Sequence, residues 1–302
     1  VMNEDNTKGW IGQPHLIKKL MKEFGENVKH LQVFNTPGTP GQRLLKVHED
    51  DELLSSEEQT EYRSGVGMLL FLVKHSRPDI ANATRELSKH MGGANRRSRK
   101  ELFRVIKYVI DTRDLGLKIE PKLEATWDLT MYTDADWAGD KDNRISIGGF
   151  VLFLCGVPIM WRSKAQKSVT LSSGESEYVS LSDAAREIKF VIMLLQTMGV
   201  KVELPVKVRV DNVSAIFMAE TANSTNRTRH VDMRYHFVRE YVEEGIIKIL
   251  FVSTDKNLAD MFTKNATKKV YDLHANELVT SCPVKQDELG DESKKADEQE
   301  GC

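Results

Sequence analysis

Apolar residues recur at helical spacing through the first part of the chain. Residues 13–24 place Leu16 and Leu20 on one side of a helix, and Gly25 follows as the expected C-terminal stop. The same pattern returns in further segments, and strand-like alternation is scarce there. We therefore predict a small, mainly helical domain over residues 1–120. The further helices are predicted over residues 58–75, 78–91 and 99–112.

The pattern changes after residue 128, where three short runs are typical of consecutive strands. Such runs follow one another with short connections, so we predict antiparallel neighbours, with turns at Gly148–Gly149 and at 155–158. A long helix from Ser173 to Met198 is expected next, closed by Gly199. The three predicted strands cover residues 130–137, 148–155 and 157–163.

Strands and helices alternate through the rest of the second half. This order predicts an α/β fold, with a mixed five-stranded sheet flanked by helices over residues 125–275. Residues 281–302 are charged and poor in large apolar residues, which is typical of a disordered tail. The remaining strands are expected at 206–212 and 246–253, and the remaining helices at 213–220, 230–245 and 257–264.

Composition and charge exclude several classes of protein. The chain has 302 residues, 40% of them hydrophobic and 29% charged, which is typical of a globular protein of about two domains. The longest apolar run, Met68–Val73, is far too short to cross a membrane, and the first residues show no signal-peptide pattern. Three widely spaced cysteines argue against a zinc or disulfide framework and fit a reducing compartment. The net charge of −2 does not by itself indicate nucleic-acid binding.

Four acidic residues stand where predicted strands and helices reach the rim of the sheet. They are Asp134 in TMYTDADWAG, Glu177 in LSSGESEY, Asp211 in VRVDN and Asp260 in KNLADMFTK. Carboxylates that converge without cationic partners are costly unless a metal ion joins them. Hard oxygen ligands suit Mg²⁺ or Mn²⁺, and a pair of such ions can activate water and stabilise the leaving oxygen at a phosphodiester. The pattern therefore indicates a metal-dependent nuclease.

Two of these acids have an acidic neighbour two residues away. Asp134 and Asp136 point to the same face of a strand, so alternation cannot choose between them. Glu177 shares its side of the helix with apolar residues that are expected to face the sheet. Glu175 lies on a mostly polar side, where it either faces solvent or helps a neighbouring serine to cap the helix.

The other two acids have simple structural alternatives. Asp211 lies on the strand face opposite Val208 and Val210, and its alternative role is an Asx turn with Asn212. Asp260 stands near the start of a predicted helix, where acidic residues are common because they interact favourably with the helix dipole.

Long stretches of the chain resemble the Pol polyproteins of Ty1/copia-type retrotransposons. The matching stretches are YTDADWAGDKDNRISIGGFVLFL, MWRSKAQKSVTLSSGESEYVSLSDAAREI, VRVDNVSAI, RTRHVDMRYHFVREYVEEGIIKI and NLADMFTK, preceded by EYRSGVGMLLFLVKHSRPDIANATRELSKHM. The resemblance implies the thumb and connection end of a reverse transcriptase over residues 1–120, followed by a ribonuclease H-like domain. The chain departs from the family at FTKNAT, where the family tends to continue FTKPL, and at ETANSTNR.

The resemblance implies an Asp-Glu-Asp-Asp site that binds a pair of Mg²⁺ or Mn²⁺ ions. Asp134 and Asp211 would bridge the ions, while Glu177 and Asp260 would each complete one coordination shell. The implied reaction is hydrolysis of the RNA strand of an RNA–DNA hybrid, with RNA selected by contacts to its 2′-hydroxyl groups. The polymerase pattern Tyr-x-Asp-Asp does not occur in the chain, so the palm and fingers of the reverse transcriptase are implied as partners.

The resemblance also implies an intracellular location, in a cytoplasmic particle and in the nucleus, without a membrane partner; a homodimer is compatible with it. Basic residues are expected to contact phosphates along the duplex, and a solvated helix face is the alternative for each of them. A dense basic run over residues 96–107 is expected to grip the duplex upstream. The expected contact residues are Arg162, Lys164, Lys167, Arg227, Arg229, His230 and Arg234.

Two other functions are compatible with the sequence. Transposases and integrases share this fold class, but their carboxylates usually come in the order Asp, Asp, Glu, whereas Glu177 stands between two aspartates. The other alternative is a catalytically silent remnant that binds nucleic acid or is inert. The presence of all four acids argues against complete decay.

Overall fold

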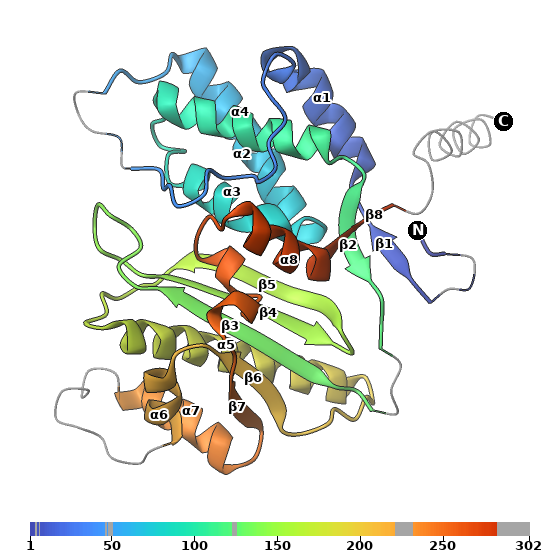
Figure 1. The fold of residues 1–302 in the computed structure, drawn as a ribbon, viewed down its shortest axis with the longest axis vertical. Coiled ribbons are helices and arrows are strands. Elements are labelled where there is room, and N and C mark those ends of the chain that lie inside the picture. The colour runs from blue at the N-terminus through green and yellow to red at the C-terminus, as the bar shows by residue number, and fades with distance from the viewer. Residues whose placement is uncertain are drawn as a thin grey trace.

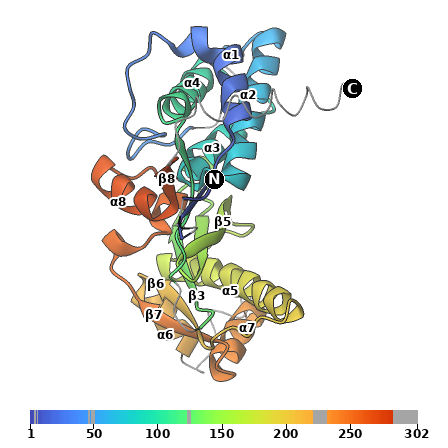
Figure 2. The ribbon, with the colours of Figure 1, turned by 90° about the vertical axis from the view of Figure 1, so that its right-hand side faces the viewer.

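A computed structural model describes residues 1–3, 5, 7–45, 47, 51–122, 126–220 and 232–282, without the side chains of residues 232–235. Within this part of the chain, helices cover both faces of a central sheet (Figures 1 and 2). None of its helices is both long enough and apolar enough to cross a membrane.

The helical part of the chain contains α1 (Pro14–Val28), α2 (Ser56–His75), α3 (Ala81–Ser88) and α4 (Arg96–Asp111). The predicted stop of α1 at Gly25 is wrong, because the helix continues to Val28 and closes when the Lys29 N–H donates to the Gly25 carbonyl. Ser55 begins α2 with a capping box, in which it exchanges hydrogen bonds with Glu58. These signals fix the ends of the helices, and their apolar sides form a common core with residues such as Leu69 and Leu102.

The central sheet consists of β3 (Leu129–Asp136), β4 (Ile147–Leu154), β5 (Val157–Ala165), β6 (Val206–Val210) and β7 (Ile247–Phe251). Its order is β5-β4-β3-β6-β7. The strands β3, β4 and β5 are antiparallel neighbours, as predicted, whereas β6 runs parallel to both β3 and β7. The predicted class, a mixed five-stranded sheet flanked by helices after a mainly helical part, is therefore confirmed.

Gly148 and Gly149 lie inside β4, so the turn predicted for them is wrong. A Cβ atom on Gly149 would lie 2.7 Å from the Cβ of Phe262 and 2.9 Å from the Cγ2 of Thr263. Gly149 is also the register partner of Asp134 on β3. The glycine therefore allows the segment around Phe262 to lie directly against the sheet beside Asp134.

Each face of the sheet packs on a different core. One face packs on α5 (Ser173–Thr197) and α6 (Val213–Glu220), with Phe150 and Leu152 of β4 in this core. The other face packs on the helical part, and Val151 and Phe153 of β4 lie in that core. The alternation of side chains along β4 thus serves two apolar surfaces, so the sheet is covered on both sides. The helix α7 (Asp232–Glu243) follows α6 on the first side.

The C-terminal elements connect the sheet to the helical part. In place of the helix predicted over 257–264, the chain forms the 3-10 turns η3 (Thr254–Lys256) and η4 (Asp260–Phe262). Two elements then follow that the sequence reasoning missed, α8 (Lys268–Leu278) and β8 (Val279–Ser281). In Figure 1, α8 lies between the helices of the helical part and the sheet.

A small second sheet also joins the ends of the chain. β8 pairs with β2 (Leu115–Ile119), and β2 pairs with β1 (Gly9–Ile11). The helical part therefore shares a core and a sheet with residues beyond 275, and the expected division near residue 120 does not separate two cores. The assignment of residues 1–120 to a thumb and connection remnant stays a prediction. Of the expected tail, Ser281 belongs to β8, and 283–302 lie outside the described residues.

Candidate metal centre

Neighbouring elements bring three of the four predicted acids to one edge of the sheet. Asp134 is the sixth residue of β3, and Asp211 directly follows β6. Because β3 and β6 are parallel, with Tyr132 opposite Arg209, both carboxylates stand at the same end of adjacent strands. Glu177 lies in the second turn of α5, which packs against the sheet face that holds Leu129 and Met131 of β3.

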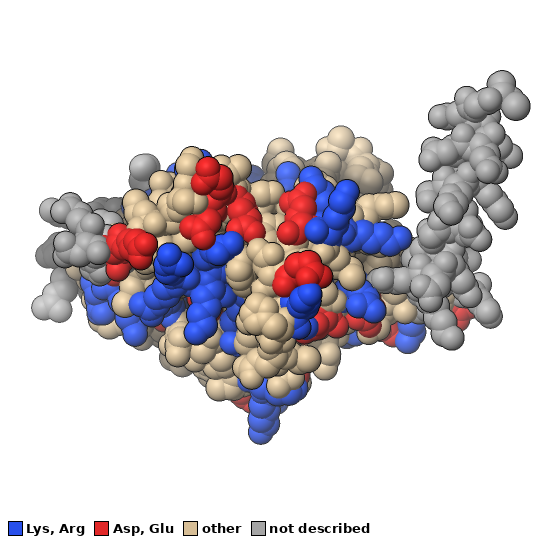
Figure 3. All heavy atoms as spheres, turned by 90° about the horizontal axis from the view of Figure 1, so that it is seen from above, with Lys and Arg blue, Asp and Glu red and all other residues tan. Residues whose placement is uncertain are grey.

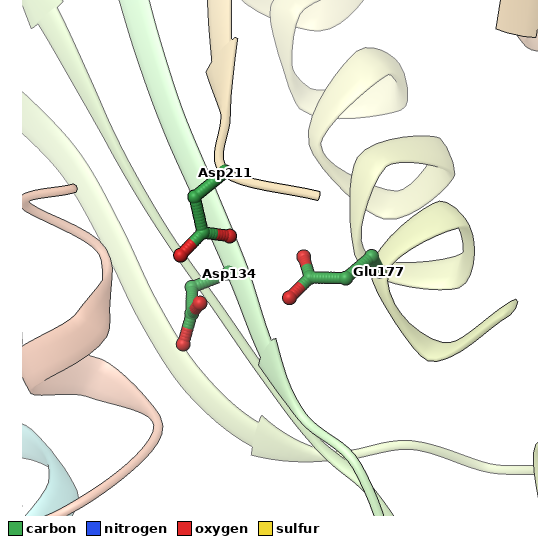
Figure 4. Close-up of side chains that lie close together, drawn as sticks. All are labelled: Asp134, Glu177 and Asp211. Carbon is green, nitrogen blue, oxygen red and sulfur yellow. The ribbon is translucent and has the colours of Figure 1, made fainter. Parts of the chain in front are cut away.

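One carboxylate oxygen each from Asp134, Glu177 and Asp211 lies within 4.8 Å of the other two. Figure 4 shows the three side chains close together, with Glu177 extending from α5 toward Asp134 on β3 and Asp211 at the end of β6. Asp134 and Glu177 are each 5% exposed, whereas Asp211 is half-buried. The prediction that these three acids converge is confirmed by this geometry.

Burial and mutual repulsion make ionisation of this group costly. The pKa of Asp134 is raised from its usual 3.8 to about 7, first by burial and then by the charges of Asp260 and Asp211. Burial also raises the pKa of Glu177 well above its ordinary value, and Asp134 and Asp211 add to the effect. The Oε2 atom of Glu177 is buried, and no hydrogen-bond partner for it lies within the described residues. These hard oxygen donors suit a divalent cation such as Mg²⁺ or Mn²⁺.

Asp260 is buried at the start of η4, and its carboxylate lies outside this group of three. Its Oδ1 atom lies 2.5 Å from the Nζ atom of Lys264, four residues later. Desolvation lowers the pKa of Lys264, but the contact with Asp260 and the charges of Asp134 and Asp211 outweigh it and raise the net value. The fourth predicted ligand is therefore near enough to influence Asp134 electrostatically, but it is held by a lysine.

Thr263 is a site residue that the sequence reasoning missed. Its hydroxyl donates to Oδ2 of Asp134, and the absence of a side chain on Gly149 lets it approach. Asn257 supports the same segment, because its side-chain amide donates to the Thr133 carbonyl over 3.0 Å. Thr263 sits within the quoted NLADMFTK stretch, so the motif contained the residue, but no periodicity marked its role.

The structure separates each acid from its acidic neighbour. Asp136 does not join the group of three; its Oδ2 atom forms an ion pair with Arg43 of the helical part. Glu175 is buried, so its predicted exposure to solvent is wrong. Its Oε2 atom accepts from the Leu171 N–H over 2.7 Å, and Ser172 accepts from the Glu175 N–H over 3.2 Å, which confirms the capping alternative.

The predicted nucleic-acid contacts are brought together only in part. Arg162 pairs with Asp183 at 2.6 Å and with Glu187 at 3.3 Å, so it is engaged within the fold. Lys164 and Lys167 are exposed, and Lys164 is opposite Gly148 in the register, at the same end of the sheet as Asp134. The others fall outside what the structure describes: Arg227, Arg229 and His230 as residues, and Arg234 as a side chain.

The basic run over residues 96–107 is largely engaged within the helical part. Arg99 pairs with Glu58 and Glu61, and Lys107 pairs with Asp111. Arg104 donates to the carbonyl groups of the loop at 36–38. Figure 3, which views the molecule from the side of the helical part, shows basic and acidic side chains interspersed on this surface. These contacts weaken the expectation that the run grips a duplex.

Comparison with known proteins finds similarity to the Pol polyproteins of retrotransposons. It is 35% identical over 227 residues to the Retrovirus-related Pol polyprotein from transposon RE1 of Arabidopsis thaliana, covering 75% of this chain and 15% of that protein. It is 32% identical over 278 residues to the Retrovirus-related Pol polyprotein from transposon TNT 1-94 of Nicotiana tabacum, covering 90% of this chain and 20% of that protein. The chain is homologous to part of the Ty1/copia-type Pol polyproteins.

The chain spans about a fifth or less of the length of these relatives. No family model matches it. Among solved structures, LC11-RNase H1 in complex with RNA/DNA hybrid aligns with a TM-score of 0.35 and 15% identity, over 47% of this chain and 98% of that chain. The fold is therefore described by the strand order and the mixed strand directions of the chain itself.

Proposed function

We propose that the chain hydrolyses the RNA strand of RNA–DNA hybrids with the help of Mg²⁺ or Mn²⁺. The observation that carries the proposal is the convergence of Asp134, Glu177 and Asp211 at the rim of the sheet, with oxygen atoms within 4.8 Å of one another. A buried group of carboxylates without a cation is electrostatically unfavourable, and such perturbed groups concentrate at functional sites. The copia-type homology supports the choice of a hybrid as substrate.

Each acid would have a defined task in this reaction. Asp134 and Asp211 would hold a pair of divalent ions between them, and Glu177 and Asp260 would complete the two ligand sets. Bound Mg²⁺ or Mn²⁺ would supply the positive charge that activates a water molecule and stabilises the leaving 3′-oxygen. Thr263 would keep the Asp134 carboxylate oriented by donating to its Oδ2 atom.

Exposed lysines near the acids would position the substrate. Lys164 and Lys167 lie at the end of β5 and just after it, where their ammonium groups can contact phosphates without reading the base sequence. Discrimination for RNA would come from contacts to the 2′-hydroxyl groups. Upstream palm and fingers of a reverse transcriptase would be the protein partner.

The test is a strand-specific cleavage assay with the purified chain. A hybrid labelled separately on each strand should lose its RNA strand in the presence of Mg²⁺ or Mn²⁺, and duplex DNA should stay intact. Asp134→Asn and Asp211→Asn should each abolish cutting while the circular dichroism spectrum is unchanged. Glu175→Gln is the matched control, because glutamine can still cap α5. Undiminished cutting by Asp134→Asn would refute the proposal.

A further inference from the structure

One cation of the helical part contacts the rim of the sheet directly beside the three acids. Arg43 lies in the loop between α1 and α2, and its side chain is only 10% exposed. Its Nη2 atom pairs with Asp136 and donates to the Thr263 carbonyl over 2.8 Å, while its Nη1 atom lies 3.3 Å from Oε1 of Glu86. The guanidinium group therefore bridges the helical part, the end of β3 and the segment after η4.

Hydrogen bonds from the helical part and from the segment after η4 fix the loop that carries Arg43. The neighbouring Leu44 N–H donates to Oε2 of Glu86 over 3.1 Å, so the same carboxylate binds the loop twice. The side-chain amide of Asn265 donates to the Gln42 carbonyl over 2.8 Å. The backbone carbonyl of Asn265 accepts from the Gly41 N–H over 3.0 Å. Asn265 belongs to the FTKNAT sequence that departs from the family, and here it ties the loop to the site segment.

Asp134 and Asp136 are two neighbouring candidates for the same metal ligand on β3. Both side chains leave β3 on the same face, and both carboxylates could in principle bind a divalent ion. Arg43 neutralises Asp136, whereas Asp134 has Thr263 and the other acids around it. Thr263 contacts both residues, because its carbonyl accepts from Arg43 and its hydroxyl donates to Asp134.

We propose that Arg43 is a positioning residue that decides which carboxylate at the end of β3 serves the metal centre. It holds Asp136 in an ion pair outside the centre and fixes the segment whose threonine orients Asp134. The helical part would then be a component of the active site, not only a neighbour of it. This inference rests on the proposed metal centre and adds a role that the acids alone do not provide.

The first arm of the test is the removal of the charge of Arg43. Arg43→Gln keeps a donor for the Thr263 carbonyl but leaves Asp136 unpaired beside the centre. Because an additional negative charge attracts the cation, Mn²⁺ should bind about threefold to tenfold more tightly in isothermal titrations. The kcat for hybrid cleavage should fall about tenfold, because the competing carboxylate draws the ion from its productive position. KM should not change, since the buried Arg43 cannot contact the hybrid.

The second arm is rescue by removal of the competing acid. Arg43→Gln combined with Asp136→Asn should return both Mn²⁺ affinity and kcat to within about threefold of Asp136→Asn alone. Arg43→Lys keeps the positive charge and should retain the parent affinity for Mn²⁺. Arg99→Gln is the matched control, because Arg99 also pairs with two carboxylates, Glu58 and Glu61, but lies within the helical part.

The outcomes separate this inference from the proposed reaction. Weaker Mn²⁺ binding by Arg43→Gln, with no recovery on adding Asp136→Asn, would show that Arg43 merely stabilises the fold and would overturn the inference. If Arg43→Gln does not fold, the variant that combines Arg43→Gln with Asp136→Asn still tests the inference. A kcat of this double variant far below that of Asp136→Asn alone would overturn the inference. A parent chain that binds Mn²⁺ without cutting hybrids would refute the proposed reaction. The Mn²⁺ affinities of the Arg43 variants would still test the role of Arg43. A parent that binds no more Mn²⁺ than Asp134→Asn would refute both.

Discussion

The Nζ atom of Lys264 lies 2.5 Å from Oδ1 of Asp260, so the fourth acid of the site carries its own counter-ion. Asp260 is buried and adds negative charge beside Asp134, which makes this pair more than a surface contact. The Lys264 side chain is 45% exposed, but its removal would leave the buried Asp260 carboxylate without a counter-ion, and that is the costly part of such a change.

We predict that Lys264→Met lowers the stability of the metal-free chain by on the order of 1 kcal/mol or more. Added Mg²⁺ should then raise the melting temperature of the variant more than that of the parent, because it neutralises the uncompensated acid. Lys268→Met is the control: Lys268 and Asp272 are also four residues apart and form an ion pair, but both side chains are exposed. Thermal melts in EDTA and in Mg²⁺ measure both effects, and equal responses of the two variants would contradict the role given to Lys264.

A second prediction concerns the pH dependence of stability without metal. Burial, followed by the charges of Asp260 and Asp211, raises the pKa of Asp134 from 3.8 to about 7 in the folded chain. Between these values the folded state keeps a proton that the unfolded chain has released. The contribution of Asp134 to stability is therefore complete below about pH 4 and is lost as the pH rises through about 7. Burial also raises the pKa of Glu177, so its contribution to stability is likewise lost as the pH rises.

Urea unfolding in EDTA at about pH 5 and about pH 8 measures this dependence. The parent chain should lose on the order of a few kcal/mol between the two conditions. The Asp134→Asn variant has no titratable group at this position, so its free energy of unfolding should fall clearly less between the two conditions. An equal loss in both proteins would show that Asp134 ionises normally in the folded state.

A third prediction separates the two glutamates at the start of α5. Glu177→Gln should lose most hybrid cleavage, because its side chain belongs to the group of acids. Glu175→Gln should keep cleavage within a small factor, because its role is to cap the helix through the Leu171 N–H. Single-turnover cleavage rates test this, and the reverse order would mean that the helix is rotated relative to the sheet.

A fourth prediction concerns the glycine opposite Asp134. Gly149→Ala should lower the free energy of unfolding by about 1–3 kcal/mol, because the new methyl group would meet Phe262 and Thr263. It should also reduce cleavage by displacing Thr263 from Asp134. Gly67→Ala is the contrasting variant: it lies within α2, no atom lies within 4 Å of its added Cβ, and alanine should stabilise the helix by about 0.5–1 kcal/mol. Loss of stability in both variants would contradict this account of Gly149.

The sequence predicted much of the sheet part because its signals are local. Short strand-like segments with short connections located β3, β4 and β5, and Gly199, with a φ of +78°, marked the end of α5. Helical phase correctly placed Glu177 inward, since the phase of a regular helix determines which residues share a side. The convergence of Asp134 with Asp211 was implied by the resemblance to the Ty1/copia-type polyproteins, because no local signal pairs β3 with β6.

The features that the sequence did not reveal depend on contacts between distant segments. Gly148–Gly149 has the composition of a turn, but the approach of Phe262 and Thr263 requires glycine within β4. The segment after β7 was predicted as a helix, yet Asn257 binds the Thr133 carbonyl and the chain makes 3-10 turns instead. The ion pair of Arg43 with Asp136 joins residues 93 positions apart, and no local pattern encodes such a contact.

The central claim is that Asp134, Glu177 and Asp211 together form a divalent metal site, and thermal melts of the parent and Asp211→Asn test it most directly. With EDTA, the variant should melt a few degrees higher, because loss of one charge relieves repulsion worth on the order of 1 kcal/mol. Several mM MgCl₂ should stabilise the parent through linkage and the variant much less. If the two proteins melt alike and neither responds to Mg²⁺, the three acids do not bind a metal ion and the nuclease proposal loses its physical basis.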